Sequence, residues 1–440
     1  MQSYFYEIAD ALGGLLAGEE IFTCSFSGEA SDFARFNRGA ARQAGSVVQR
    51  YLTVDLIEGR RHGAGSLGLV GDLPSDISRL RELFATLREV RECVPEDPFL
   101  AYATDVRSSE RVHSGRLPER GQVMARINEE GRGRDLVGIY AAGQIYRGFA
   151  NSFGQRNWYG NESYNLDWSF FHSGDRAVKA SYAGFEWSDT ELAVRMNSAV
   201  EQLAALGRPS RTIAPGRYRV YLAPAAVFEL MGILAWGGFG LRAHRNKTTP
   251  FVRMIEGGAR LAPSIQITEN TRDGFAPDFE EAGFIRPGRV SLMRDGAYDQ
   301  CLVSPRSALE YGAETNGASP AEMPLSVEVG AGEIPRDKVL DELGSGIYVG
   351  NLWYLNFSDR TACRTTGMTR FGTFWVENGA IQAPLDVMRF DETIYRMLGE
   401  NLIGLTAERE TILDPGTYSE RSTDSARLPG ALVDDFTFTL

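Results

Sequence analysis

The sequence contains few of the side chains that most often carry out catalysis or hold metals. Only 4 histidines and 4 cysteines occur among its 440 residues. The histidines are His62, His113, His172 and His244. No two are close enough in the sequence to form an HxxxH or HExxH pair, the spacing that puts two zinc ligands on one helical face. A metal site built from neighbouring histidines is therefore excluded.

Cysteine is equally scattered. The four residues are Cys24, Cys93, Cys301 and Cys363. None belongs to a CxxC pair, and a long chain with dispersed cysteines does not form a disulfide framework. The N-terminal segment carries Glu7 and Asp10 and lacks the positive charges that begin a secretory signal. These features predict a reducing, cytoplasmic location.

Positive charge is also in short supply. The chain has 46 Lys+Arg against 58 Asp+Glu, a formal net charge of -12. Proteins that grip phosphate backbones need clustered lysine and arginine, and no such block is present. One apolar stretch, residues 220–241, has the length of a membrane span, but Pro224, Glu229 and four glycines interrupt it. We expect a buried strand and helix there, with neither nucleic acid nor membrane as partner.

The patterning that is present predicts an α+β protein of two domains. The first, residues 1–208, is an N-terminal α/β domain with an antiparallel sheet; the second, residues 217–440, is a β-rich C-terminal domain. The polar, proline-containing residues 207–216 separate them. Apolar residues recur at helical spacing after Asp72 and after the capping residue Ser188, which predicts one helix after each. Residues 146–187 are predicted to form antiparallel strands joined by turns.

In the second domain, we expect one helix from Pro224 to about Trp236 and a last helix from Asp391 to about Asn401. After Pro415 the chain is polar, and we expect it to be irregular apart from residues 435–439. The dipeptides Asp295-Gly296 and Asn378-Gly379 are typical of tight turns between strands.

Standard catalytic motifs are absent. There is no phosphate-binding loop of the GxxxxGK[ST] type and no GxSxG nucleophile elbow. The carboxylates of Asp278-Phe279-Glu280-Glu281 could supply an acid and a base, although adjacent carboxylates in a polar loop usually form a solvated surface. The residue types alone therefore identify no active site.

Several segments nevertheless resemble, in order along the chain, the TldD/TldE (PmbA) family. The resemblance is strongest in the last three. The segments are Ala150–Gly154, Val220–Met231, Phe275–Gly283, Gly350–Asn356, Thr366–Gly379 and Met388–Phe390. The resemblance implies a two-domain fold and a role in a zinc metalloprotease that cleaves small unfolded or precursor peptides.

In that family the TldD-type subunit carries an HExxxH zinc motif directly after the segment that resembles Val220–Met231. Aligned without a gap, its two histidines and glutamate fall on Gly232, Gly237 and Ile233. None of these can bind zinc or act as a base, and no cysteine follows Cys363 to serve as a further ligand. The resemblance therefore implies a TldE/PmbA-type subunit with no catalytic or metal-binding residue and no cofactor of its own. Zinc is expected in a TldD-type partner, with which the chain forms a heterodimer.

The resemblance also nominates peptide-binding residues in the most similar segments. They are Trp353, Tyr354, Asn356, Thr369, Arg370 and Phe371. Residues 371–377 alternate as a strand that could add an extended peptide, although a strand paired inside the domain core is the more usual case. Two alternatives stay open: a self-sufficient hydrolase that uses His244 or the carboxylates near Asp278, and a homodimeric peptide-binding or regulatory protein.

Overall fold

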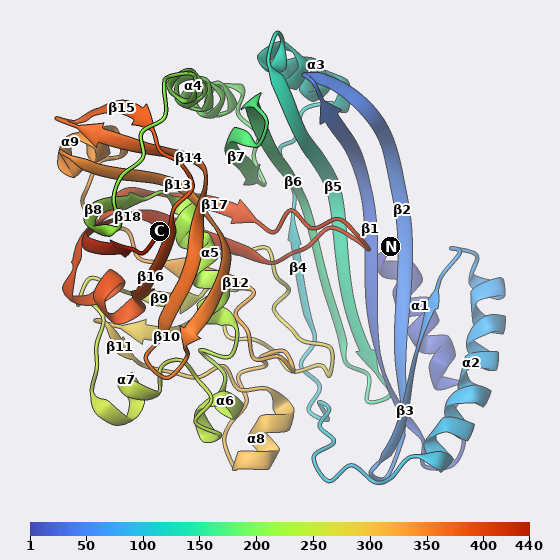
Figure 1. Cartoon of the computed structure of the whole chain (residues 1–440). Coiled ribbons are helices and arrows are strands. Elements are labelled where there is room, and N and C mark those ends of the chain that lie inside the picture. Colours follow the sequence, from blue (N-terminus) through green and yellow to red (C-terminus); the bar gives the residue numbers. More distant parts are fainter.

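The computed structural model describes all 440 residues and consists of two β-sheets, each with its own helices (Figure 1). The first sheet has 7 strands in the order β3-β2-β1-β5-β6-β4, and β7 pairs with β6 alongside β4. Its elements are α1 Gln2–Gly13, β1 Ile21–Asn37, β2 Ala40–Glu58, β3 Arg61–Gly68, α2 Leu73–Cys93, β4 Ser109–His113, α3 Arg120–Gly131, β5 Asp135–Asn151, β6 Arg156–Ser173, β7 Arg176–Gly184 and α4 Asp189–Leu206.

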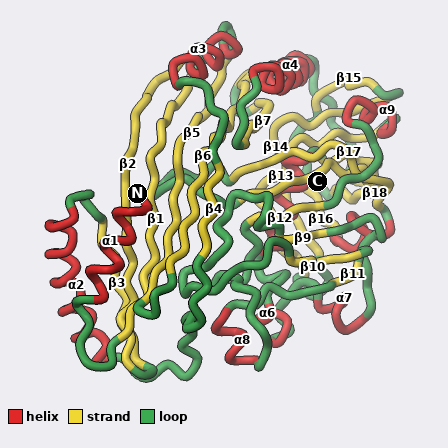
Figure 2. The backbone as a smooth tube through the Cα atoms, turned by 180° about the vertical axis from the view of Figure 1, so that it is seen from behind, coloured by secondary structure: helices red, strands yellow, loops and turns green.

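Alternation along β1 explains the two faces of this sheet. The apolar residues point to one face and pack beneath α1 and α2: Phe22, Cys24 and Phe26. The polar residues of β1 point to the other face: Ser25, Ser27, Glu29 and Ser31. Seen from behind, α1 and α2 lie at one end of the sheet and α3 and α4 at the other (Figure 2). The polar face is left for the second domain.

The second sheet has 11 strands. Five of them, β18, β16, β14, β13 and β8, form a closed ring, because β8 also pairs with β18. The elements are β8 Gly216–Leu222, α5 Pro224–Ala235, α6 Leu241–Arg245, α7 Val252–Gly257, β9 Ile267–Glu269, β10 Val290–Arg294, β11 Ala297–Tyr298, α8 Pro305–Tyr311, β12 Ser326–Val329, η1 Arg336–Lys338, α9 Val339–Leu343, β13 Gly346–Asp359, β14 Arg364–Glu377, β15 Ala380–Pro384, β16 Arg389–Thr393, the π-helical turn η2 Arg396–Glu400, β17 Leu402–Leu413 and β18 Ser425–Phe438.

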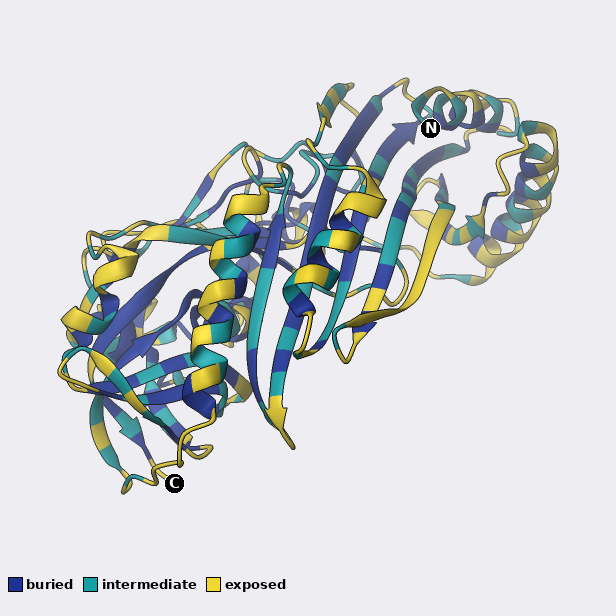
Figure 3. Ribbon diagram, turned by 90° about the horizontal axis from the view of Figure 1, so that it is seen from above, coloured by how far each residue is buried: buried dark blue, intermediate teal, exposed yellow.

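The apolar helix α5 packs against β13 and β18 and contributes to the main core of the second domain. Buried residues lie mostly on the strands of the two sheets, apart from the exposed first half of β2, whereas the helices expose one face (Figure 3). No helix is long and apolar enough to cross a membrane. The α+β fold expected from the sequence, with an antiparallel first sheet and a β-rich second domain, is therefore confirmed.

The loop between β17 and β18 reaches across to the polar face of the first sheet (Figure 1). Arg421, only 2% exposed, inserts there and donates hydrogen bonds to the carbonyl oxygens of Gly143 (3.1 Å) and Ser163 (2.9 Å). It also donates to the Ser31 and Ser163 hydroxyls, and its main-chain N–H donates to Glu29. Burial lowers the pKa of Arg421 to about 10, so the guanidinium stays charged at neutral pH. This arginine ties the two domains together.

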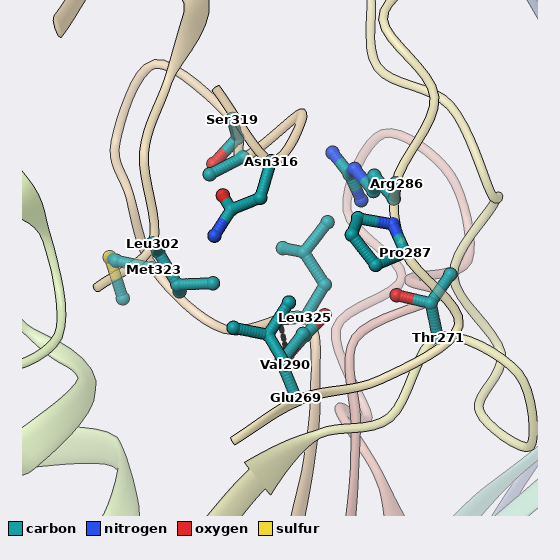
Figure 4. Close-up of a pocket in the computed structure, with 11 residues that line it drawn as sticks. Glu269, Thr271, Arg286, Pro287, Val290, Leu302, Asn316, Ser319, Met323 and Leu325 are labelled. Atoms are coloured by element: carbon teal, nitrogen blue, oxygen red, sulfur yellow. Dashed lines mark hydrogen bonds between the residues drawn. The ribbon is translucent and has the colours of Figure 1, made fainter. Parts of the chain in front are cut away.

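A second loop, residues 270–287, docks onto the same sheet. Its carbonyl groups accept hydrogen bonds from Tyr159 and Gln155 at 2.7 Å each. Arg286 lies at its end beside a cavity of about 10 Å³, the smallest that holds one water (Figure 4). Glu269, on the far side of this cavity from Arg286, accepts hydrogen bonds from the main-chain N–H groups of Leu325 (3.0 Å) and Ser326 (3.1 Å).

Three carboxyl groups near Arg286 have raised pKa values. Burial raises the pKa of Glu269 to about 7 and that of Glu280 to about 7. Burial, together with the charge of Asp414, raises the pKa of Asp424 to about 6. Their common cause is desolvation, because nearby Arg286 only partly offsets the loss of water. The native state therefore binds protons that the unfolded chain releases.

The expectations for the C-terminal end were wrong in two places. Residues 389–393 form β16, in which Asp391 pairs with Thr366 of β14, so the last helix begins at Ile394, later than expected, and runs to Glu400. Residues 425–438 form the long strand β18 instead of irregular chain. Pro429 and Gly430 disfavour a strand locally, but pairing with β17 and β8 stabilises it.

Replacing Arg421 with alanine should strongly destabilise the protein. The change removes the guanidinium donor from the carbonyl groups of Gly143 and Ser163, and each hydrogen bond to a charged group contributes about 1.5–3 kcal/mol. We expect a loss of about 3 kcal/mol or more in the free energy of unfolding, measured by urea denaturation. The control is Arg294→Ala, which removes an exposed ion pair with Asp299 and should cost less than about 1 kcal/mol. Equal effects of the two variants would contradict this role of Arg421.

Stability should also fall as the pH rises from about 6.5 to 8.5. A carboxyl group whose folded pKa is raised contributes stability that is full below its unfolded pKa and is lost as the pH passes through its folded value. For Glu269 and Glu280 that loss begins above the unfolded value of about 4.3 and ends as the pH passes through about 7, so its last part falls in this range. Glu20, whose pKa the hydrogen bond from Arg88 lowers to about 2, titrates far below it.

Thermal denaturation across this range measures the slope. The variants Glu269→Gln and Glu280→Gln keep the hydrogen-bond acceptors without a titrating group, so each should flatten it. The exposed Glu310→Gln serves as the control. An unchanged slope in both buried variants would refute the assignment.

Candidate functional site

Helix α5 contains or adjoins the positions where the family motif would lie. It begins at Pro224, directly after β8, and its apolar side chains face the core. Gly232 is exposed, and a Cβ built on it would meet no atom within 4 Å. Ile233 is buried in the core, so its side chain points away from Gly232. Gly237 follows the helix end with φ of +75°, a left-handed conformation that favours glycine.

Arg360, in the β13–β14 turn, lies against the loop that ends α5. Its Nη2 donates to the Trp236 carbonyl at 2.6 Å, and its Nε donates to the Thr248 carbonyl at 2.7 Å. The guanidinium carbon also lies 5.4 Å from the Trp236 ring centre and 4.8 Å from that of Phe357. A Cβ on Gly237 would lie only 2.7 Å from Nη2. A guanidinium therefore fills the space that a side chain at position 237 would need.

These residues do not fit a zinc ion. Gly232, Ile233 and Gly237 offer no nitrogen, oxygen or sulfur side-chain ligand. Nowhere in the structure do three or more His, Cys, Asp or Glu side chains lie together in a way that could hold a metal ion. The positive charge of Arg360 beside Gly237 would also repel a divalent cation.

His244 lies on the short helix α6, next to Cys301. The His244 Nδ1 is 3.5 Å from the Cys301 Sγ, and the Tyr298 ring centre is 4.2 Å from that of the imidazole. Burial lowers the pKa of His244 to about 4 and raises the pKa of the Cys301 thiol. At neutral pH the pair is therefore an uncharged imidazole and an uncharged thiol, a poor combination for nucleophilic attack.

The carboxylates near Asp278 are not arranged as an acid and base facing a common substrate. Glu280 is buried, and its Oε1 accepts hydrogen bonds from the N–H groups of Ala282 (2.9 Å) and Phe284 (3.1 Å). Glu281 beside it is exposed. Glu280 therefore shapes its own loop, and the geometry gives it a structural role.

Four of the six nominated peptide-binding residues form one surface, which we call the hairpin face: Trp353, Tyr354, Arg370 and Phe371. Arg370 lies over the Trp353 ring at 5.0 Å and the Phe371 ring at 5.3 Å. Trp353 is 49% exposed and Tyr354 is 75% exposed. Exposed aromatic side chains beside an arginine are typical of surfaces that contact a partner.

The other two nominated residues serve the hairpin itself. Thr369 is buried, and its hydroxyl accepts a hydrogen bond from the N–H of Met388 at 3.0 Å. Asn356 is exposed, but its Oδ1 accepts from the N–H of the next residue at 2.8 Å. Residues 374–377 are no free edge either, because β14 lies between β13 and β15 there.

A large cavity lies between the two domains, and no sequence pattern predicted it. This interdomain cavity has a volume of about 560 Å³, within the range of about 300–1,000 Å³ that is usual for ligand pockets. Its walls come from β7 and α4 of the first domain and from β8, β13, α9 and the start of α5 of the second. No local sequence signal marks it, because each wall is an ordinary strand or helix.

The walls of the interdomain cavity carry charged and aromatic side chains. Arg195 of α4 forms an ion pair with Glu410 of β17 at 3.2 Å, which links the domains. Arg336 lies 3.6 Å from the same glutamate. The rings of Tyr221 and Tyr348 are 5.4 Å apart, and burial raises the pKa of Tyr348 to about 12.

Known structures share this architecture over their whole length. A protein from Thermotoga maritima described as a candidate modulator of DNA gyrase has a TM-score of 0.77 at 14% identity, with 99% of this chain and 100% of that chain covered. TldE from Thermococcus kodakarensis gives 0.76 at 12% identity, with 99% and 100% covered. A candidate gyrase modulator from Bacteroides thetaiotaomicron gives 0.74 at 13%, with 99% and 98% covered. At such low identity the likeness shows the fold alone.

Comparison of sequences is informative for the second domain. No protein of curated function matches the chain significantly. Residues 215–440, however, match the profile of the PmbA/TldA metallopeptidase C-terminal domain, and this match covers more than half of the chain. The chain therefore belongs to the PmbA/TldD family of metallopeptidase-like proteins.

Proposed function

We propose that this chain is the non-catalytic, TldE-type subunit of a heterodimeric zinc metallopeptidase that cleaves small unfolded or precursor peptides. The observation that supports this proposal most directly is the set of side chains at and beside α5. Gly232, Ile233 and Gly237 stand at the motif positions, and Arg360 fills the space beside Gly237. A subunit with this arrangement needs a partner to supply the zinc ion, its ligands and the catalytic base.

The hairpin face supports a role in binding a peptide or a partner protein. The hairpin face presents aromatic rings and one arginine, and it has no unpaired strand edge. It can therefore contact the side chains of peptides that differ in sequence. Arg370 is only loosely held by Asp175, at 3.5 Å, and Asp175 is itself largely exposed. A bound peptide can therefore compete for this cation at little cost.

The alternative of a self-sufficient hydrolase has less support. His244 has no carboxylate among its hydrogen-bond partners to orient it, and its Nε2 is buried without a partner. A base with a pKa near 4 removes protons poorly from a neutral nucleophile. The pair of His244 and Cys301 fits better as a packed part of the second domain.

Zinc content and peptidase activity test the proposal. The isolated chain should contain no stoichiometric zinc and cleave no unfolded peptide. A mixture with a TldD-type chain that carries HExxxH should contain stoichiometric zinc and cleave the peptide. The matched control is the same mixture with the partner's motif glutamate changed to glutamine, which should be inactive. Stoichiometric zinc and proteolysis by the isolated chain would refute the proposal, and a stable homodimer that ignores every TldD-type chain would favour the peptide-binding alternative.

Two alanine substitutions test whether the motif positions still accept side chains. Gly232→Ala should stabilise the chain by about 0.5–1 kcal/mol, since glycine inside a helix is unfavourable and the space around it is open. Gly237→Ala should destabilise it by about 1–2 kcal/mol, the usual cost of a left-handed residue, and should also displace Arg360. Urea denaturation of both variants provides the comparison. A harmless Gly237→Ala would mean that Arg360 does not close this site.

A further inference from the structure

A second cavity lies where the two domains meet, on the polar face of the first sheet. This junction cavity has a volume of about 360 Å³, which suits a small molecule. The first domain lines it with side chains of β1, β2 and β5, and the second domain lines it with loop residues from 277–286, 319–325 and 420–423. It shares Arg286 and Ser319 with the much smaller cavity of Figure 4. A ligand in the junction cavity touches both domains at once.

Arg286 brings a positive charge to this cavity that no ion pair neutralises. Its Nε donates a hydrogen bond to the Gly317 carbonyl at 2.9 Å, whereas neither of its Nη atoms has a hydrogen-bond partner in the protein. Glu280 and Asp424 lie near enough to influence the charge of Arg286, but neither forms an ion pair with it. The two Nη groups of a guanidinium form a planar fork that binds a carboxylate through two parallel hydrogen bonds. This fork is unused inside the chain.

Glu280 lines the same cavity with the opposite charge. The residue is only 5% exposed, and its Oε1 accepts the hydrogen bonds from the N–H groups of Ala282 and Phe284 that hold its own loop. The other oxygen, Oε2, accepts no hydrogen bond from the protein. An enclosed carboxylate is costly unless it is paired, and an ammonium group is a suitable partner because it offers several N–H donors.

The other charged side chains of the wall are already paired or exposed. Arg147 forms an ion pair with Glu420 at 3.0 Å, and the Ser27 hydroxyl donates a hydrogen bond to the same glutamate. Glu281 is exposed to solvent. Once these are set apart, one guanidinium and one enclosed carboxyl group remain. The junction cavity therefore favours a ligand that carries both a negative and a positive charge over one that is only an acid or only a base.

Hydroxyl groups make up much of the remaining wall. Ser25 of β1 lies on the side of the first domain, and Ser319 and Thr423 lie on the side of the second. The hydroxyl groups of these three residues have no hydrogen-bond partner in the protein. Because a hydroxyl group both donates and accepts, this wall favours an uncharged polar group on the ligand.

We propose that the junction cavity binds a free amino acid with an uncharged polar side chain. Its carboxylate pairs with the Nη groups of Arg286, its ammonium group pairs with Oε2 of Glu280, and its side chain contacts the hydroxyl groups. Since Arg286 and Glu280 belong to the second domain and Ser25 to the first, the bound amino acid links the two domains. This inference does not depend on the proposed function, because it involves neither peptide cleavage nor the zinc-bearing partner.

Isothermal titration calorimetry of the full chain tests the recognition of both charges. The probe is L-glutamine, compared with two analogues that each lack one charge. L-Glutaminamide has an amide in place of the carboxylate, and glutaramate lacks the ammonium group. L-Glutamine should bind, and each analogue should bind at least about tenfold more weakly, because each leaves one charged group of the cavity unpaired. Absence of binding by L-glutamine, or equal affinity for either analogue, would overturn the proposal.

The affinity for L-glutamine should also depend on pH. An ammonium group pairs with the ionised form of Glu280, and burial raises the pKa of this residue to about 7. Raising the pH from about 6 to about 7.5 should therefore strengthen binding at least about fivefold, and binding should release protons to the buffer. Glutaramate has no ammonium group, so its affinity should not rise in this range. An affinity for L-glutamine that is independent of pH would contradict the pairing with Glu280.

Three substitutions locate the site. Glu280→Gln keeps the acceptor for the loop N–H groups but removes the charge, so it should weaken binding at least about tenfold and abolish its pH dependence. The matched control is Glu269→Gln, because Glu269 is also 5% exposed but does not line the junction cavity. It should change the affinity by no more than about threefold. Thr53→Phe places a ring in the cavity from β2, where aromatic residues are well tolerated, and should block binding. Unchanged binding in the phenylalanine variant, or equal losses in the two glutamine variants, would refute this location.

Discussion

The polar face of the first sheet is the constraint on which the rest of the structure depends. Alternation along β1 places serines and Glu29 on one face, so β1 presents hydrogen-bonding groups there that need polar partners when they are buried. The second domain satisfies this face with Arg421 and with the carbonyl groups of residues 270–287. Because these groups are buried and hydrogen-bonded, the relative position of the two domains is defined by directional contacts.

This docking produces the two features that matter for function. It leaves a cavity between β7 of the first domain and β8 and β13 of the second, because the two sheets do not continue into one another there. It also buries Glu269 and Glu280 near Arg286, which links the stability of the junction to pH. A purely apolar interface would contain no buried carboxyl groups that titrate near neutral pH.

Helix α5 and the loop after it are held in place by different contacts. The helix is held in place by its apolar side chains, so its packing does not depend on side chains at Gly232 and Gly237. Arg360 then stabilises the loop through two carbonyl groups and two aromatic rings. The scaffold of a metallopeptidase-like domain is thus retained while the space next to Gly237 is occupied by a cation. This is the physical basis of the proposal that another subunit supplies the catalytic zinc site.

The sequence by itself determined the features that depend on local patterns. The capping residue Ser188, the stripe of α2, the strands of residues 146–187 and the helix from Pro224 were all predictable, since periodicity and caps act within one element. The vacant positions at Gly232, Ile233 and Gly237 were also visible in the sequence, through the resemblance to the family. Only the tertiary structure decided that β18 is a long paired strand, that Arg360 lies beside Gly237, and that β7 borders a cavity. Each of these arises from side chains or strands far apart in the chain, whose contacts exist only after the two sheets have formed and docked.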